Sequence, residues 1–303
     1  MEIKVYKSAS GYHGVYPMIY AYFDKNGEIF DEPIRASVNC MINHNIQGLA
    51  VLGLASEVNK LSYKNKLKLL ECVCDTNQKR VPVSVTISEN SVSGQINFIK
   101  TAKDFGADWF ILQPPPVPDA SEEQLVDFFS AVIDKVDSPV GIQNAPQYLG
   151  FGLSNASIKK LSKRHSNFKL IKTEFGSCDV KKLFDETEGE IDIFNGVGGC
   201  ELPDVLRAGA AGVIPGGESF DLLLQAYNNM RINEEQEAER LYREILPLML
   251  FLEDSIDHLI SYGKIALARR LKVSEGYPAL PSTICTDFGL QVVQRLIDKL
   301  PKL

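Results

Sequence analysis

The residue that is best suited to take part in a reaction is a lysine at the end of a short apolar run. The run Phe168–Lys172 reads Phe-Lys-Leu-Ile-Lys and is followed by Thr173 and Glu174. If the run is a β-strand, its side chains alternate between faces, and Lys172 shares a face with Phe168 and Leu170. Poor hydration at the inner end of a strand favours the neutral amine, which is the form that attacks a carbonyl carbon. The alternative is a lysine that solvates the exposed end of a strand.

The composition is that of an ordinary globular protein and argues against several classes of partner. The chain has 303 residues, of which 45% are hydrophobic and 23% charged, and its formal net charge is −7. An acidic chain of this kind is poorly suited to a nucleic-acid partner. Two basic clusters, at 163–165 and 269–272, fall in helix-like stretches and are explained by solvated helix faces.

The cysteines and the hydropathy pattern predict an intracellular protein without a metal or another cofactor. The six cysteines are irregularly spaced and form no paired Cys-x-x-Cys units, which argues against a structural zinc site and a disulfide scaffold. The sequence from Met1 to Tyr6 shows no signal peptide, and no apolar stretch approaches the ~20 residues of a transmembrane helix. We therefore expect a cytoplasmic protein with no membrane partner.

Eight short apolar runs alternate with amphipathic segments along the first part of the chain. Such runs are typical of parallel strands that are covered by helices, and eight of them favour a closed (β/α)8 TIM barrel over an open sheet. The runs lie at 14–23, 48–53, 81–87, 108–113, 140–144, 168–172, 191–195 and 211–215.

The pattern changes after the eighth unit. From Glu234 to Leu303 only helical periodicity is present, with Pro247 as an expected kink and a proline-rich stretch at 276–281. The sequence thus predicts an α/β fold, a (β/α)8 barrel over 1–232 with a C-terminal helical extension over 233–303.

The order of short motifs resembles that of the dihydrodipicolinate synthase and N-acetylneuraminate lyase family of Schiff-base lyases and aldolases. The resemblance covers essentially the whole chain. It is carried by Tyr20-Ala21-Tyr22-Phe23, Gly53-Leu54-Ala55-Ser56-Glu57, Asn144-Ala145-Pro146, Ile171-Lys172-Thr173-Glu174 and the segment 208–214.

The resemblance implies a role for several residues at the mouth of the barrel. Lys172 takes the place of the imine-forming lysine, and the Ile214 carbonyl lines the imine. The Ala55 and Ser56 N–H groups and the Ser56 hydroxyl are expected to hold the carboxylate of a 2-oxo acid. The family also implies a homotetramer or a homodimer.

Four departures from the family pattern concern acid–base chemistry and substrate choice. Gln143 replaces a tyrosine that shuttles protons, and an amide cannot carry a proton near neutral pH. A second family tyrosine falls within the prolines at 114–116 and is absent. Tyr148 replaces an arginine that grips a substrate carboxylate, so aspartate semialdehyde loses its bidentate clamp. The family's two hydroxyl residues at the substrate carboxylate have become Leu54 and Ala55.

Two side chains remain as candidates for the missing proton carrier. Tyr148 is the first, although an aromatic ring that packs over a loop explains it as well. Glu174 is the second, with a solvated loop carboxylate as its alternative. Both are expected to contact the substrate.

Glycine clusters follow the seventh and the eighth run. The clusters, at 196–199 and 216–217, allow a phosphate-binding loop, a tight turn or close approach of the backbone to a substrate. Gly196 is therefore a candidate substrate-binding position. Glu201 is a candidate contact for a polyol or a favourable charge at a helix N-terminus.

Two functions from different classes fit these residues. The first is a Schiff-base lyase, aldolase or dehydratase that acts on a 2-oxo acid such as pyruvate or a deoxy sugar acid through Lys172. The second is a non-catalytic barrel that binds a 2-oxo acid and has lost its proton-shuttling tyrosine. Trapping with borohydride in the presence of pyruvate separates a carbonyl-binding lysine from an inert one.

Overall fold

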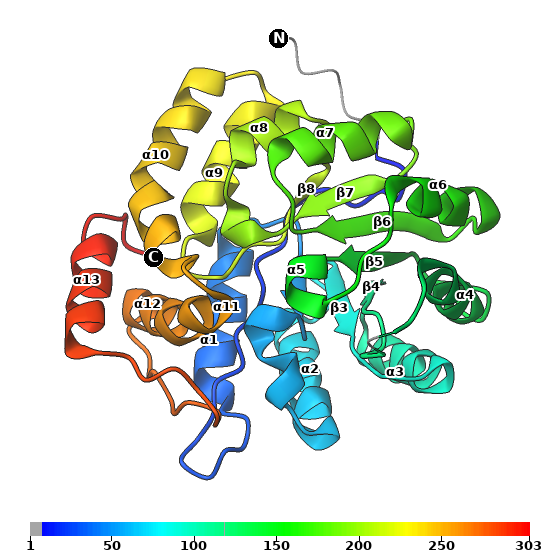
Figure 1. Ribbon diagram of the computed structural model, residues 1–303. Helices are drawn as coiled ribbons and strands as arrows, with labels where there is room; N and C mark the ends of the chain where they lie inside the picture. Colours follow the sequence, from blue (N-terminus) through cyan, green and yellow to red (C-terminus); the bar gives the residue numbers. More distant parts are fainter. Residues whose placement is uncertain (1–7, 118) are drawn as a thin grey trace.

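The computed structural model describes residues 8–117 and 119–303 and contains eight parallel strands in one sheet (Figure 1). The spatial order of the strands, from β1 through β8 and back down to β2, brings the two ends of the sheet together. The strands are β1 (Gly14–Val15), β2 (Leu49–Val51), β3 (Val83–Ile87), β4 (Trp109–Leu112), β5 (Val140–Asn144), β6 (Phe168–Thr173), β7 (Asp192–Asn195) and β8 (Gly212–Val213). The predicted (β/α)8 barrel is confirmed.

The barrel closes through backbone contacts that follow β1. The Ile19 N–H donates to the Ala50 carbonyl at 2.8 Å, and the Ala50 N–H donates to the Pro17 carbonyl at 3.1 Å. Met18 and Ala50 form a parallel bridge there. The first strand is shorter than the predicted run at 14–23, because Pro17 has no N–H for a continuous ladder.

Helices separate the strands and form the outer layer of the barrel (Figure 1). Serine side chains start several of them by accepting backbone N–H groups: Ser62 for α2, Ser91 for α3, Ser121 for α4 and Ser154 for α6. The helices are α1 (Asp31–Asn43), α2 (Tyr63–Asn77), α3 (Val92–Phe105), α4 (Glu122–Ile133), α5 (Pro146–Leu149), α6 (Asn155–Arg164), α7 (Ser177–Glu186), α8 (Leu202–Arg207) and α9 (Phe220–Arg231).

The C-terminal part is helical, as predicted, and Figure 1 shows it on one side of the barrel in orange and red. It comprises α10 (Glu235–Leu252), α11 (Ile256–His258), the π-helical turn Leu259–Gly263, α12 (Lys264–Leu271) and α13 (Asp287–Ile297). Helix α10 packs along α9, and α12 packs against α1. The boundary near residue 232 stays a prediction, because α10 continues directly from the outer layer of the barrel. No helix in the described ranges is long and apolar enough to span a membrane.

Strand register shows which side chains point into the barrel. Gln143, Lys172, Phe194 and Gly212 are partners on the neighbouring strands β5 to β8, so they share one face of the sheet. The Phe194 ring contacts Trp109 of β4 at a centroid distance of 5.2 Å and Tyr16 after β1 at 5.3 Å. These strands lie on different sides of the barrel, so the shared face is the interior, and Lys172 points inward.

The aromatic cluster inside the barrel gives a first testable prediction. Phe194→Ala removes a fully buried ring and leaves a cavity beside Trp109, which should lower the free energy of unfolding by about 3–5 kcal/mol. The chain has one tryptophan, so denaturant titration followed by Trp109 fluorescence reports on this layer directly. Phe288 is 74% exposed, and Phe288→Ala should stay within about 0.5 kcal/mol of the parent. Equal destabilisation by the two changes would contradict the assignment of Phe194 to the core.

Candidate active site

The centre of the candidate site is an ion pair at the C-terminal end of β6. Lys172 Nζ lies 2.7 Å from Glu174 Oε1, and the two side chains are only 6% and 7% exposed. Thr173, between them, points to the opposite face and donates its hydroxyl to Asn195 Oδ1 at 2.9 Å. A buried lysine with an adjacent carboxylate is an amine with a proton acceptor in place, which is what nucleophilic attack on a carbonyl requires.

Two further groups hold the Glu174 carboxylate, one at each oxygen. The Val197 N–H donates to Oε2 at 2.6 Å, and the Gln143 side-chain amide donates at 3.5 Å to Oε1, the oxygen that also contacts Lys172. A Cβ at Gly196 would overlap this carboxylate, so the glycine provides the space that Glu174 occupies. Gly196 therefore serves the site through Glu174, a relation that sequence spacing does not show.

Gln143 lies beside the ion pair and continues into a chain of buried amides. Its Oε1 accepts from Gln113 Nε2 at 2.8 Å, and the Gln113 carbonyl accepts from Gln95 Nε2 at 2.8 Å. Register places Gln143 next to Lys172 on the inner face. The amide is thus positioned between Glu174 and the barrel wall, where it can donate a hydrogen bond but cannot carry a proton.

The loop after β2 forms a short 3-10 turn, Leu54–Ser56, whose first two residues line the pocket around Lys172. The Ser56 hydroxyl donates to the Ile19 carbonyl at 2.6 Å and accepts from the Leu52 N–H, and the Ser56 N–H donates to the Gly53 carbonyl. Ser56 thus fastens the loop to the segment that follows β1, and the N–H and hydroxyl donors that were predicted for a substrate carboxylate are both engaged within the protein. Within the described ranges, the N–H groups of Leu54 and Ala55 have no hydrogen-bond partner, so they are the donors that this loop presents.

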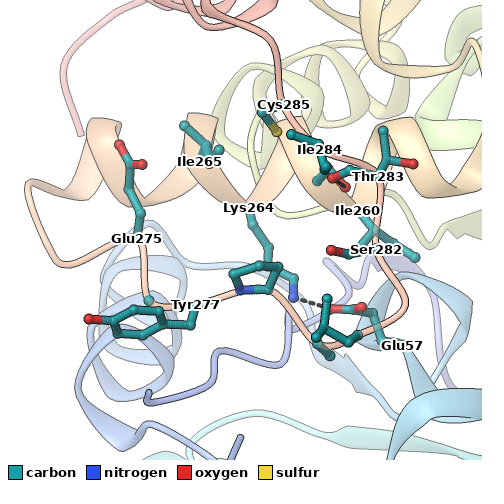
Figure 2. Close-up of a pocket in the computed structure, with 15 residues that line it drawn as sticks. Glu57, Ile260, Lys264, Ile265, Glu275, Tyr277, Ser282, Thr283, Ile284 and Cys285 are labelled. Atoms are coloured by element: carbon teal, nitrogen blue, oxygen red, sulfur yellow. Dashed lines mark hydrogen bonds and ion pairs between the residues drawn. The ribbon is translucent and has the colours of Figure 1, made fainter. Parts of the chain in front are cut away.

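Glu57 holds the same loop from the other side. It has a left-handed backbone, with φ of 58°, and its carboxylate pairs with Lys60 at 2.9 Å and with the buried Lys264 of α12. Figure 2 shows the Lys264 ammonium and the Glu57 carboxylate facing each other, with Tyr277 to one side and Ile284 above. Both residues line a hollow that lies outside the barrel mouth and does not include Lys172.

A narrow pocket opens above Lys172. Its wall comes from the ends of the strands and from the C-terminal helical region, so both parts of the chain build it. The lining residues are Met18, Leu54, Ala55, Tyr148, Lys172, Glu174, Val197, Gly198, Ile214, Pro215, Gly216, Glu253, Ile256 and Leu259.

The pocket brings together most of the residues that the sequence singled out. Leu54, Ala55, Tyr148, Glu174 and Ile214 line it together with Lys172. Three others lie behind this surface: Ser56 in the loop anchor, Gln143 beside Glu174, and Gly196 beneath the Glu174 carboxylate.

Tyr148 lies at the rim of the pocket, in α5, and is 41% exposed. Partial burial raises the pKa of its hydroxyl, and the carboxylates of Glu174 and Glu253 raise it further. The phenol therefore keeps its proton near neutral pH, so it is a hydrogen-bond donor in this pocket rather than a base.

Glu253 was not singled out by the sequence pattern, although it lines the pocket. It follows the last residue of α10, and its Oε1 is buried without a hydrogen-bond partner among the described residues. Burial raises the pKa of Glu253 to about 7, with further increases from the charges of Glu218 and Glu174 and a partial offset from Lys172. A polar residue directly after an apolar helical run reads as an ordinary helix end, so no signal in the sequence placed this carboxyl over Lys172.

Glu218 is a second buried carboxyl near the pocket, in the loop after β8. Tyr20 donates its hydroxyl to Glu218 Oε2 at 2.7 Å, and burial raises the pKa of Glu218. The glycines of this loop make room for the pair, because a Cβ at Gly216 would overlap the Glu218 carboxylate. The loop is thus filled by a carboxyl and a phenol, which is unfavourable for a phosphate. Glu201 lies apart from the pocket lining and accepts the Ser177 N–H at 2.8 Å.

A parallel eight-stranded barrel with a buried lysine at the mouth defines a TIM-barrel protein with the layout of a lysine-dependent active site. A family model described as the dihydrodipicolinate synthetase family matches residues 11–296, and the chain belongs to this family. The resemblance noted from the sequence is confirmed.

Curated relatives agree with this membership, and solved structures share the fold. The chain is 27% identical over 239 residues to the 4-hydroxy-tetrahydrodipicolinate synthase of Methanopyrus kandleri, covering 78% of this chain and 79% of the relative. It superposes on a putative dihydrodipicolinate synthetase from Pseudomonas aeruginosa with a TM-score of 0.89 at 22% identity, over 95% of this chain and 99% of the other. A Ruminococcus gnavus sialic acid aldolase with a mutated catalytic lysine gives a TM-score of 0.86 at 19% identity, over 95% of each chain.

The unpartnered carboxyl of Glu253 predicts a pH dependence of stability. Its folded-state pKa, about 7, lies above the ordinary value of 4.5 for a glutamate, so the folded protein holds this proton more tightly than the unfolded chain. The contribution to the free energy of unfolding is fully present below about pH 4.5 and is lost as the pH rises through about 7. Glu253→Gln should remove this loss, on the order of 1–3 kcal/mol, when the two proteins are compared by denaturant titration at pH 5 and pH 8. An identical pH dependence in both proteins would contradict the burial of an unpaired carboxyl.

Proposed function

We propose that the protein is a Schiff-base lyase or aldolase that acts on a 2-oxo acid through Lys172 and that has diverged from dihydrodipicolinate synthase. The observation that carries the proposal is the buried Lys172–Glu174 pair at the base of the barrel-mouth pocket. The named relatives support the class of reaction, and the site residues support the choice of substrate.

The first chemical step follows from the arrangement of this pair. Glu174 accepts a proton from the Lys172 ammonium, and the freed amine attacks the C2 carbonyl carbon of the oxo acid. The C2 oxygen leaves as water, and a protonated imine remains. The positive imine nitrogen then accepts the electron pair released when a C–C bond or a C–H bond at C3 breaks. The backbone carbonyl of Ile214, which the family places beside the imine, is proposed to line it.

The carboxylate of the oxo acid requires hydrogen-bond donors on the neighbouring wall of the pocket. We assign them to the Leu54 and Ala55 N–H groups, which begin the turn after β2 and have no partner among the described residues. Ser56 and Glu57 hold this turn in place through Ile19 and Lys264. The replacement of hydroxyl residues at 54 and 55 leaves these backbone donors in position.

Substrate choice separates this chain from the synthases after which its relatives are named. The pocket holds Tyr148 where an arginine clamps the carboxylate of aspartate semialdehyde, and carboxyls of Glu174 and Glu253 face the same space. A second carboxylate in the substrate would lack its cation and meet negative charge. We therefore propose a deoxy sugar acid or a related hydroxylated 2-oxo acid, and we expect no robust synthase activity on aspartate semialdehyde.

The alternative function is a barrel that binds a 2-oxo acid without turnover. Gln143 favours it, because this amide occupies the position of the family's proton-shuttling tyrosine and is engaged with Gln113. The carboxyls of Glu174 and Glu253 favour the enzyme, because they supply acid–base groups that the amide lacks. We also propose a cytoplasmic homotetramer or homodimer, on the basis of the family.

Lys172→Ala should abolish trapping by pyruvate and borohydride, because no other amine lines this pocket in the part of the chain that the structure describes. Mass measurement of the intact protein detects the added pyruvyl group. Lys169 lies on the same strand, but its side chain is on the opposite face from that of Lys172. Lys169→Ala is therefore the matched control and should be trapped like the parent.

The outcome of the trapping experiment distinguishes the alternatives. Lys172→Arg keeps a cation beside Glu174 but cannot form the imine, so it should also resist trapping while it preserves the fold. Continued trapping of Lys172→Ala would overturn the assignment of the lysine. Trapping without turnover on any oxo acid would favour the binding protein.

Tyr148→Phe tests the role of the hydroxyl at the rim. Because the raised pKa keeps the phenol protonated, we expect a loss of less than about 10-fold in kcat/KM, as for one lost hydrogen bond. The ring and its packing are retained, so melting temperature should not change. Steady-state kinetics with a deoxy sugar acid give the measurement, and a loss of ~10²-fold or more would instead assign proton transfer to Tyr148.

A further inference from the structure

The C-terminal helical extension places one carboxyl into the reaction pocket. Glu253 ends α10, while Lys172 lies at the end of β6, and the pocket lining contains both. Between them, the β7 loop comes close to the Glu253 carboxyl at Gly198, where a Cβ would overlap Oε1. The glycine at 198, with φ of +58°, thus leaves the space in which this carboxyl sits.

The contacts of the Glu253 side chain show no role in stabilising the fold. Its Oε1 is buried, and among the described residues it has no hydrogen-bond partner. A buried polar atom without a partner costs free energy, so the position is unfavourable until a ligand supplies the missing partner. The other buried carboxyls nearby are already engaged, Glu174 with Lys172 and Val197, and Glu218 with Tyr20.

We propose that Glu253 is the acid–base group for the oxygen on C4 of the substrate, and that the second carbonyl substrate is an uncharged hydroxyaldehyde. The inference rests on the proposed imine chemistry of Lys172 and adds a residue and a substrate class to it. Lys172 holds C2 at the base of the pocket, and the carboxyl of Glu253 lines the part contributed by the helical extension.

The proposed cleavage step begins with the loss of the proton from the C4 hydroxyl of the substrate. The Glu253 carboxylate takes the proton of the C4 hydroxyl, and the O–H electron pair forms the C4 carbonyl. The C3–C4 bond breaks, its electrons form the C2–C3 double bond, and the imine nitrogen becomes neutral. In the condensation direction, the protonated Glu253 returns the proton to the aldehyde oxygen while C3 attacks the aldehyde carbon.

The surroundings of Glu253 suit a group that changes protonation near neutral pH. Burial is the main cause of its raised pKa, which lies at about 7, and the charges of Glu218 and Glu174 add to it while Lys172 opposes it. Such a group serves as a base in one direction and as an acid in the other. The titratable and charged groups that face it are Tyr20, Tyr148, Lys172, Glu174, Cys200 and Glu218.

The same carboxyls select against a charged second substrate. Lys172 carries the one cation that lines the pocket in the described part of the chain, and its charge is lost when the protonated imine becomes the neutral enamine that attacks the aldehyde. A carboxylate on the second substrate would therefore meet Glu174 and Glu253 with no compensating cation. A hydroxyl in the same place can donate to Glu253 Oε1 and satisfy it.

The test uses two aldehydes of similar size with the full-length protein. Glycolaldehyde carries a hydroxymethyl group where glyoxylate carries a carboxylate. We expect pyruvate to condense with glycolaldehyde at least ~10-fold faster than with glyoxylate, as the imbalance of charge in the pocket implies. The kcat/KM for glycolaldehyde should fall as the pH rises above about 7, the pKa of Glu253. The kcat/KM for cleavage of the aldol product should instead rise with pH through about 7, because cleavage requires Glu253 as the carboxylate.

Glu253→Gln keeps the size of the side chain and removes its proton transfer. We expect condensation with glycolaldehyde to fall by ~10²-fold or more, the usual size of a general acid–base effect, and the pH limb near 7 to disappear. Trapping of pyruvate on Lys172 should stay within about twofold, which reports an intact pocket. Asp254→Asn, one residue away and exposed, is the matched control and should leave rate and pH profile unchanged.

Failure of this inference is distinct from failure of the imine chemistry. If the parent protein is not trapped by pyruvate, the function proposed for Lys172 is wrong. If the parent is trapped but prefers glyoxylate, or does not condense glycolaldehyde, the substrate class is wrong. Unchanged rate and pH profile in Glu253→Gln, or loss of trapping in this folded variant, would falsify the acid–base role. Circular dichroism and thermal melting establish that the variant is folded.

Discussion

The site depends on one buried ion pair, between Lys172 and Glu174. Taking two charges out of water is costly, and the pair is stable only if further hydrogen bonds satisfy the carboxylate. The Val197 N–H supplies one, and the absence of a Cβ at Gly196 lets the carboxylate come that close. The buried ion pair therefore requires both the glycine after β7 and the lysine at the end of β6. A parallel barrel brings the two together, because it places both strand ends at the same mouth.

The barrel alone does not complete this mouth. Lys264 of α12 pairs with Glu57 and fixes the turn at 54–56 that lines the pocket, and Glu253 follows α10 at the pocket itself. The helical extension thus acts on the site at two places, once through a buried ion pair and once through a free carboxyl. Loss of one partner from a buried pair typically costs about 3–5 kcal/mol, so the turn and the extension are energetically coupled.

Much of this arrangement could be predicted from the sequence, because it depends on local periodicity. The eight apolar runs gave the barrel, and alternation along 168–172 gave the inward direction of Lys172. Contacts between distant segments could not be read in this way. The Ser56 hydroxyl bonds to the Ile19 carbonyl, and Glu253 reaches the pocket across the β7 loop. Neither contact could be predicted from the periodicity of the sequence, because each depends on how loops from different strands pack.

If Gln143 replaces the family's tyrosine, as we propose, this replacement has a physical counterpart elsewhere in the pocket. An amide removes a proton carrier from the wall of the barrel, and its Oε1 is occupied by Gln113. Carboxyls then surround the lysine, with Glu174 in contact with it and Glu253 on the helical side of the pocket. A carboxyl in water is too acidic to hold a proton near neutral pH, whereas burial among like charges raises its pKa into that range. Burial of Glu253 without a partner therefore supplies the property that the tyrosine position has lost, and this requires the helical extension to cover the pocket.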